Sequence, residues 1–393
     1  MTTRRPPPIG VMERKARLAA LRADMEKHKT DAVVLGATSS LRYFTGVAWR
    51  PSERFVGAIV SRERVDYIAP RFELDKVSSL VAIPGEILTW QEEESPYALI
   101  AGHVGANATL GLDDQMALFT YRGLRGEFAD ENLTDAGAMI NRLRRCKSPA
   151  EIALMQHAKN ITLEVQRRAH AQLYPGQMAS EVMQLIDAEH RALSGGPSTF
   201  CIVSFGEDTS LPHGGEGDRA LREGDVVLID TGCAVGGYNS DITRTYVFGE
   251  ASEEVRAVWT AEKEAQAAAF DAAQLGRACS SVDDAARASL VANGFGPDYD
   301  LPGLPHRTGH GIGLDIHEAP NLVRGDATPL DIGMCFSNEP MIVVPGRFGV
   351  RLEDHFFMTA SGPRWFTEPS PSLDAPFDDA EFFDVDEAVF SSH

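Results

Sequence analysis

Residues 226–245, VVLIDTGCAVGGYNSDITRT, decide the fold of this chain. The first four are apolar and predict a buried strand that ends on Asp230. Glycines then predict a turn, and a second strand-like segment carries Asp241. A turn about residues 235–236 places the two carboxylates directly opposite each other, whereas a turn about residues 236–237 places them diagonally on one sheet face. Two carboxylates beside an apolar strand need a cation or must share a proton, and we favour a cation.

A second hairpin is predicted downstream, where residues 336–339 (FSNE) lead into MIVVPGRFGVRLED. A turn centred on Gly346 sets Glu339 opposite Glu353. Between the hairpins lies a glycine-rich segment, HRTGHGIGLDIHE, with three histidines: His306, His310 and His317. Four carboxylates and an imidazole suit two divalent ions, because bridging oxygens offset the repulsion between the ions.

Taken together, IDTG with SDITRT, HRTGHGIGLDIHE, SNEP and VRLED closely resemble the motifs of the Xaa-Pro dipeptidases (prolidases) of the M24-type pita-bread metallopeptidase family. Xaa-Pro aminopeptidases and methionine aminopeptidases are less similar. The resemblance covers most of the chain, most strongly from about residue 148 to residue 357. It implies an α/β creatinase-like N-terminal domain (residues 1–146) and an α+β pita-bread catalytic domain (residues 147–393).

The resemblance also implies the ligands of two divalent ions, with manganese favoured and zinc or cobalt as alternatives. The implied ligands are Asp230, Asp241, His310, Glu339 and Glu353. By the same likeness Asp241 and Glu353 bridge the ions. Glu339 is both a ligand and a carboxylate, so we expect it to take the proton of the attacking water and pass it to the leaving nitrogen. His213 and His317 are expected to line the substrate pocket and donate to the oxyanion.

Arg351, two residues before Glu353, is expected to share its strand face and to orient the bridging carboxylates through a bidentate contact. Arg324 either pairs with the C-terminal carboxylate of the substrate or is a free surface arginine. Trp49 lies in LRYFTGVAWRPSERF, which we read as a loop. That loop either covers an aromatic cluster or, by the resemblance, helps to close the site of a neighbouring subunit.

One position departs from the family pattern. Most relatives have a tyrosine four residues after the fourth ligand, and here Val343 stands in its place. Residues 339, 341 and 343 share a strand face, so we expect Val343 to face the metal cavity. The other site residues are intact, which predicts an active peptidase with a differently shaped substrate pocket.

The composition, with 393 residues of which 43% are hydrophobic and 24% charged, predicts a globular protein of two domains. A net charge of −20 argues against nucleic-acid and anionic membrane partners. Five widely spaced cysteines predict reduced thiols. The first ten residues lack a signal-peptide core, and no apolar run of about 18 residues occurs. We therefore expect a cytoplasmic protein and, by resemblance, a homodimer.

The start of the second domain is marked by Ser148 and Glu151, which form a capping box with proline at the first helical position. The helix is expected to run to about Gln172. In the preceding half, a helix over residues 11–28 and further helices alternate with short strands, which predicts an α/β arrangement.

These features predict metal-dependent hydrolysis of the X-Pro bond in dipeptides that have proline at the second position. One alternative is an Xaa-Pro aminopeptidase that acts on longer peptides. From a different class, a lyase or a non-catalytic binding protein on the same fold remains open. A methionine aminopeptidase would not need an N-terminal domain of this length, and a binding protein would be expected to have lost ligands.

Overall fold

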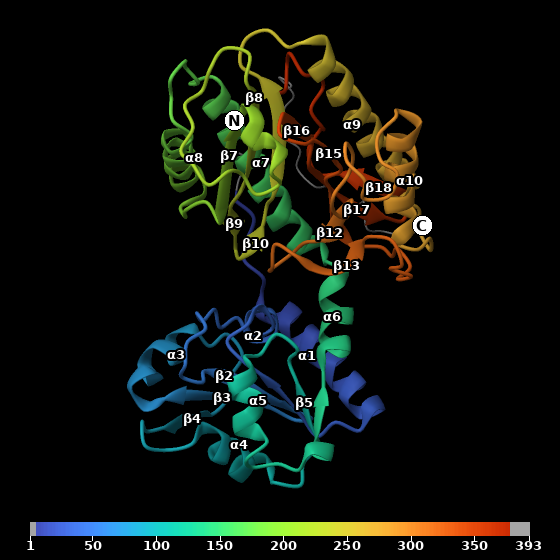
Figure 1. Cartoon of the computed structure of the whole chain (residues 1–393). Coiled ribbons are helices and arrows are strands. Elements are labelled where there is room, and N and C mark those ends of the chain that lie inside the picture. The colour runs from blue at the N-terminus through green and yellow to red at the C-terminus, as the bar shows by residue number, and fades with distance from the viewer. Residues whose placement is uncertain (1–4, 378–393) are drawn as a thin grey trace. The chain divides into compact units, whose positions relative to one another are not determined.

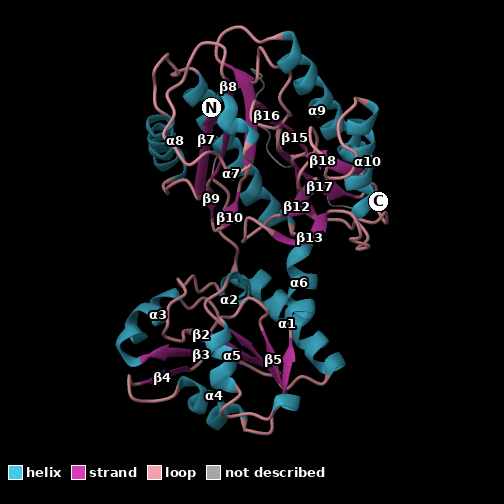
Figure 2. Cartoon of the chain, in the orientation of Figure 1, coloured by secondary structure: helices cyan, strands magenta, loops and turns pink. Residues whose placement is uncertain are grey.

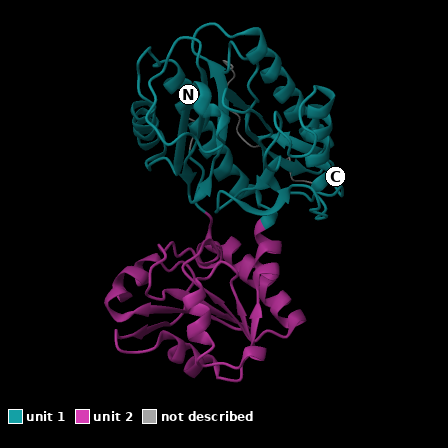
Figure 3. Ribbon diagram, in the orientation of Figure 1, with its two compact units in different colours: residues 1–8, 145–393 teal, residues 9–144 magenta. Residues whose placement is uncertain are grey.

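A computed structural model of the chain describes residues 5–377. Within them Ile9–Arg144 forms one unit and the remaining residues form a second (Figure 3). Residues 1–4, part of the segment expected to lack a signal peptide, lie outside the described residues, as do residues 378–393. Every helix between residues 5 and 377 is too short or too polar to span a bilayer.

The unit Ile9–Arg144 is built on one six-stranded mixed sheet in the order β4-β3-β2-β1-β5-β6 (Figure 2). The β1–β2 and β2–β3 pairs are antiparallel, and the other neighbours run parallel. The strands are β1 (Ala32–Leu35), β2 (Gly57–Ser61), β3 (Val65–Pro70), β4 (Ile87–Trp90), β5 (Leu110–Leu112) and β6 (Leu133–Asp135). The helices are α1 (Val11–His28), α2 (Ser39–Thr45), η1 (Arg71–Glu73), α3 (Leu74–Leu80), α4 (Pro96–Val104), α5 (Leu118–Leu124), η2 (Asp130–Asn132) and α6 (Gly137–Arg145).

Helix α1 has the expected bounds because Leu18, Leu21 and Met25 form one buried face. The loop expected over residues 41–55 is in part wrong, since residues 41–45 belong to α2. The guanidinium groups of Arg14 and Arg17 donate to the carbonyl oxygen of Tyr43 at 3.1 and 3.0 Å. They thereby satisfy a carbonyl at the end of a helix too short to be read from periodicity.

In the second unit, α7 (Pro149–His170) begins with the expected capping box. Ser148 Oγ accepts from the Glu151 amide at 3.2 Å, and Glu151 Oε2 accepts from the Ser148 amide at 2.9 Å. The other helices are α8 (Ala179–Ser194), η3 (Gly206–Ser210), α9 (Glu253–Ala272) and α10 (Ser280–Ala292). Helix α7 contacts β8 (Val226–Gly232) and helix α8 contacts β7 (Phe200–Phe205), both strands of the first sheet, and α9 contacts strands of the second hairpin (Figure 1).

The first sheet of this unit has the order β11-β8-β7, and the second has the order β13-β12-β14-β17-β18. Two short pairs, β9–β10 and β15–β16, extend the two hairpins. The strands are β7 (Phe200–Phe205), β8 (Val226–Gly232), β9 (Ala234–Val235), β10 (Tyr238–Asn239), β11 (Ile242–Val247), β12 (Gly309–Gly311), β13 (Glu318–Leu322), β14 (Cys335–Asn338), β15 (Met341–Val344), β16 (Phe348–Arg351), β17 (Asp354–Thr359) and β18 (Gly362–Trp365).

An apolar core cluster lies between α9, β8 and the β15–β16 pair. On β8, Val226 and Leu228 belong to this cluster, and Asp230 follows two residues later. Because alternate residues of a strand share a face, the face that is apolar at the start of β8 carries a carboxylate at its end. The core therefore fixes the direction in which Asp230 points.

Candidate metal centre

The first carboxylate pair is set by the turn at Gly236 and Gly237. Their φ angles of 61° and 91° are the positive values that a two-residue hairpin turn of type I′ requires. This turn pairs Thr243 with Asp230, so Asp241 lies diagonally across from Asp230. The diagonal arrangement is the second of the two alternatives that the sequence left open.

The second pair is set by a loop centred on Gly346, which has a φ of 67°. Asn338 pairs with Asp354 at one end of the hairpin and Met341 pairs with Arg351 further along. The same register places Glu339 opposite Glu353, as the sequence predicted.

Thr243 joins the two hairpins. Its carbonyl oxygen accepts from the Glu353 amide at 3.1 Å, and its hydroxyl donates to Glu353 Oε2 at 2.7 Å. Strand β11 thereby meets the start of β17, although 110 residues separate the two partners. Thr243 was not predicted from the sequence as a site residue, although its position opposite Asp230 follows once the turn is placed at Gly236–Gly237.

Arg351 is fully enclosed and uses all three guanidinium nitrogens. Nη2 lies 2.5 Å from Asp230 Oδ2, Nε donates to Thr243 Oγ1 at 3.1 Å, and Nη1 donates to the carbonyl oxygen of Pro212 at 3.0 Å. The expected bidentate contact with Asp241 and Glu353 is not the one observed. Arg351 and Glu353 lie on the same face of the strand but have different neighbours across from them. The residue next to the Arg351 side chain is Asp230.

His310 lies on β12, at a register shift between His310 and Gly311. Its Nε2 is 3.1 Å from Glu339 Oε1 and 3.8 Å from Asp241 Oδ2. Ser337 Oγ accepts from the His310 amide at 2.9 Å and donates to Glu339 Oε1 at 3.1 Å. Strand β14 thus holds the imidazole and the carboxylate together.

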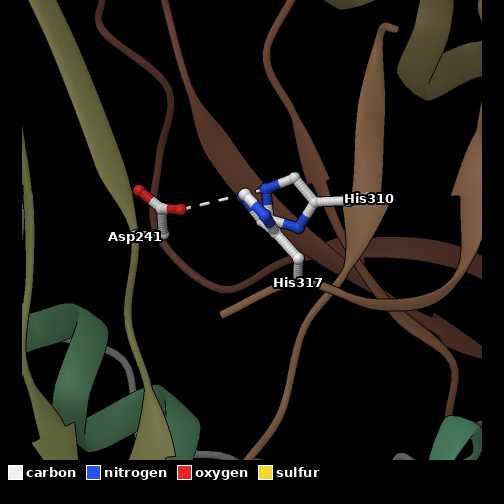
Figure 4. Close-up of side chains that lie close together, drawn as sticks. All are labelled: Asp241, His310 and His317. Atoms are coloured by element: carbon white, nitrogen blue, oxygen red, sulfur yellow. Dashed lines mark ion pairs between the residues drawn. The ribbon is translucent and has the colours of Figure 1, made fainter. Parts of the chain in front are cut away.

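His317 also reaches this cluster, from the loop before β13. Figure 4 shows the imidazoles of His310 and His317 beside each other, both facing the carboxylate of Asp241. The centroids of the two rings are 4.1 Å apart. His317 is the most exposed of the three. The pKa of His317 is lowered to about 4, first by partial burial and then by the nearby charges of His310 and Arg307. The ring is therefore neutral near pH 7.

His213 is exposed and follows Pro212, the residue whose carbonyl binds Arg351. Val343 is 4% exposed and belongs to the apolar cluster around α9. Arg324 forms an ion pair with Asp298 at 2.6 Å on the surface. The roles predicted for these residues in substrate binding stay predictions.

Trp49 lies in the other unit. Its ring packs against an apolar cluster within that unit, and the ammonium group of Lys76 lies 4.5 Å from the ring centroid. The expectation that it closes the site of a neighbouring subunit also stays a prediction.

The carboxylates perturb one another strongly. Burial raises the pKa of Asp241 well above its ordinary value, and Glu353 and Asp230 raise it further. Burial likewise raises the pKa of Glu353, with added repulsion from Glu339 and Asp230. Burial also opposes ionisation of Glu339, but the hydrogen bond and charge of His310 outweigh it and hold the pKa of Glu339 at about 2. Without a cation, Asp241 and Glu353 therefore hold their protons to a higher pH than ordinary carboxyl groups, whereas Glu339 ionises at a lower pH.

The donor set fits divalent cations. Within residues 5–377, three carboxylate oxygens of the cluster are buried without a hydrogen-bond partner, namely Asp230 Oδ1, Asp241 Oδ1 and Glu353 Oε1. Such oxygens are costly in a folded protein unless a cation or donor meets them. The cluster contains three overlapping groups of possible ligands, and within each group the ligand atoms lie within 4.8 Å of one another. The groups are Asp241 with His310 and His317, Asp241 with Glu353 and His355, and His310 with Glu339 and Glu353.

Two buried residues near the cluster were missed by the sequence analysis. His355, on β17, is fully buried, and burial holds its pKa well below the ordinary value. Lys159, on α7, is also fully buried, and burial lowers its pKa to about 8. The ammonium group of Lys159 donates to the carbonyl oxygen of Asn239 at 3.2 Å. A lysine in a helix carries no sequence signal for this position, whereas His355 is signalled by its place two residues after Glu353.

Two family models match the chain. The model described as "Metallopeptidase family M24" matches residues 153–360, and the model described as "Creatinase/Prolidase N-terminal domain" matches residues 17–146. A protein named Xaa-Pro dipeptidase from Lactobacillus helveticus is 30% identical over 358 residues, which cover 89% of this chain and 96% of that protein.

Solved structures are similar over most of their length. The dipeptidase PepE from Mycobacterium ulcerans is 32% identical with a TM-score of 0.85, and the match covers 92% of this chain and 97% of that one. A recombinant prolidase from Thermococcus sibiricus is 30% identical with a TM-score of 0.83, covering 90% of this chain and 96% of that one.

Proposed function

Because this chain belongs to metallopeptidase family M24, we propose that it hydrolyses dipeptides whose second residue is proline. The similar proteins from Lactobacillus helveticus and Thermococcus sibiricus carry the names Xaa-Pro dipeptidase and prolidase, which supports this substrate class. The observation that carries the proposal is the set of three buried carboxylates, each with an oxygen that lacks a partner in the described part of the chain. Such oxygens are suited to holding cations beside a substrate.

The proposed centre contains two divalent ions. The proposed ligands are Asp230, Asp241, His310, Glu339 and Glu353. Manganese is the proposed metal because carboxylate oxygens predominate in this set, and zinc and cobalt are the alternatives to test. When bound, the ions would acidify a water molecule for attack and polarise the scissile carbonyl.

Glu339 is proposed as the residue that moves the proton. Its Oε1 lies against His310 and Ser337, and within residues 5–377 no hydrogen bond to Oε2 is found. Oε2 is therefore suited to take a proton from the attacking water and to pass it to the leaving nitrogen. An X-Pro amide has no N–H, so its nitrogen needs this proton before proline can leave.

His317 and His213 are proposed to bind the developing oxyanion. A neutral His317 donates one ring N–H, and its place beside His310 sets that ring close to the carboxylates. His213 lies on the segment that Arg351 ties down through Pro212. Arg351 is proposed as a positioning residue, because it fixes Asp230 and this segment together.

A panel of peptides tests the proposal. The purified protein, supplied in turn with Mn²⁺, Co²⁺ and Zn²⁺, should release free proline from X-Pro dipeptides and act poorly on X-Pro-Y tripeptides. Preferred cleavage of the tripeptides would instead favour the aminopeptidase alternative. A protein that binds metal but cleaves neither would favour a lyase or a binding protein.

Metal content is measured on the same samples. The wild type should carry up to two divalent ions per chain, and Asp241→Ala should carry fewer. Asp218→Ala is a matched control, because Asp218 is an exposed aspartate of the same unit. Its carboxylate accepts a hydrogen bond from the Ser180 hydroxyl. Full peptidase activity after complete removal of metal would overturn the proposal.

A further inference from the structure

His355 occupies an unusual position in β17. It comes two residues after Glu353, so the two side chains lie on the same side of the strand. Its side chain is completely buried, and neither ring nitrogen has a hydrogen-bond partner among the described residues. An unpaired buried polar group destabilises the folded protein, so another partner is expected for this ring.

The distance to Glu353 indicates what kind of partner fits. His355 Nε2 lies 3.9 Å from Glu353 Oε1, which is too long for a hydrogen bond. Two ligand atoms that are each about 2.0–2.2 Å from one ion can be separated by up to about 4.4 Å. The gap therefore suits two ligands of a common ion better than a donor and its acceptor.

Asp241 completes this group. Ligand atoms of Asp241, Glu353 and His355 lie within 4.8 Å of one another, and all three side chains are buried. Asp241 Oδ1 and Glu353 Oε1 are themselves without hydrogen-bond partners in the part of the chain that the structure describes. Three unpaired groups from three chain positions thus face one small volume, which is the arrangement of a coordination site.

Another buried histidine provides a contrast. His190 on α8 is also completely buried, but its Nε2 lies 3.1 Å from Thr162 Oγ1. One ring nitrogen of His190 thus has a hydroxyl partner although its Nδ1 has none, whereas both ring nitrogens of His355 lack one among the described residues. Lys159 of α7 also acts on His355 electrostatically, and its positive charge lowers the pKa of the ring. The ammonium group of Lys159 already donates to the carbonyl oxygen of Asn239.

We propose that His355 is a metal ligand, which adds an imidazole nitrogen to the ion held by Asp241 and Glu353. This inference rests on the proposed metal centre and extends it to a sixth residue. Imidazole ligands suit zinc, cobalt and iron, whereas a site made of carboxylates suits manganese and magnesium. His355 is therefore expected to raise the affinity of this position for cobalt and zinc relative to manganese.

Cobalt titration tests the proposal. The metal-free wild type, His355→Gln and His355→Ala are titrated with Co²⁺, followed by visible absorption and by calorimetry. One of two binding steps should weaken by about 10-fold or more in both variants, with a changed absorption spectrum. His190→Gln, a matched change at a buried histidine whose hydrogen-bond partner is Thr162 and not a proposed ligand, should retain the wild-type isotherm and spectrum.

A second measurement leaves His355 intact and does not depend on how its variants fold. In a His310→Gln/His317→Gln variant loaded with Mn²⁺, pulsed EPR should still detect a coordinated imidazole nitrogen. Absence of that nitrogen signal, or unchanged cobalt binding in folded His355 variants, would overturn the proposal while the two-ion centre stands. If the wild type bound no divalent ion, the proposed function would fail together with it.

Discussion

Arg351 shows how one residue makes this cluster of acids compatible with a folded core. Its guanidinium group forms an ion pair with Asp230, donates to Thr243 Oγ1, and holds the segment before His213 by donating to the carbonyl oxygen of Pro212. Thr243 in turn positions Glu353 through its hydroxyl group. The carboxylates are thus oriented by neutral and cationic donors from the facing strands, and each expected bridging acid keeps an oxygen for a cation.

His317→Ala is expected to lower kcat by about 10²–10³-fold, because loss of one oxyanion donor costs about 2.7–4 kcal/mol. Steady-state kinetics on an X-Pro dipeptide measure the effect. Arg347→Ala is the control and should retain the wild-type kcat, since Arg347 is paired with Glu254 on the surface. An unchanged kcat with a raised KM in His317→Ala would assign His317 to ground-state binding instead.

Individual site residues were predictable from sequence to the extent that register determines their neighbours. The pairing of Glu339 with Glu353 follows from counting outward from Gly346. The partner of Arg351 did not follow, because it depends on how two hairpins from distant parts of the chain meet. The place of His355 two residues after Glu353 is visible in the sequence, but its burial and its unpaired nitrogens are known only from the structure.

At the scale of elements, two hairpins and one short strand carry the site. The first hairpin depends on two successive glycines with positive φ, and the second on Gly346. Strand β12 approaches β14 so closely that a Cβ on Gly309 would lie 2.1 Å from the Ser337 carbonyl oxygen. Helices with strong periodicity or caps, such as α1 and α7, were predictable, whereas the seven-residue α2 was not, since its stability comes from Arg14 and Arg17.

Gly237→Ala tests the dependence of the site on the first turn. The φ of 91° places an L-residue in a disfavoured region, so the free energy of unfolding should fall by about 1–2 kcal/mol. Urea denaturation measures this change. Gly217→Ala is the control and should change stability little, because Gly217 is exposed, lacks a positive φ and has no atom within 4 Å of the position its Cβ would take. Equal effects of the two substitutions would show that the turn conformation is not limiting.

At the scale of the whole molecule, the creatinase-like N-terminal domain and the pita-bread catalytic domain expected from the sequence are confirmed by the family matches and by the solved structures. The alternation of helices with short strands sufficed for the first domain. For the second, local patterns gave the elements, but the joining of the two hairpins through Thr243 and Glu353 is a long-range contact that no local pattern encodes.

Removal of metal should destabilise the protein in a pH-dependent way. Raised pKa values of Asp241 and Glu353 mean that the metal-free folded state holds protons that the unfolded chain releases. Its stability therefore falls as pH rises above the ordinary carboxyl pKa of about 4. Glu339, with a pKa of about 2, is ionised throughout this range and adds no slope.

Mn²⁺ should consequently raise Tm more at pH 8 than at pH 5, as measured by differential scanning calorimetry. Metal-free Asp241→Asn is the control and should lose less stability over the same range, because one of the proton-holding groups is absent. A metal-induced rise in Tm that is the same at both pH values would contradict this account.

The bridge between Thr243 and Glu353 has a consequence for synthesis. At about 5–20 residues per second, a ribosome adds the residues between these two partners in roughly 5–20 s. During that interval Asp230 and Asp241 exist without the acids and the arginine that complete their surroundings. Lys159 precedes all of them in the chain, and its ammonium group donates to the carbonyl oxygen of Asn239 in the first hairpin. The acidic half of the centre is thus synthesised after a cation that contacts its hairpin and before the second hairpin that completes the metal centre.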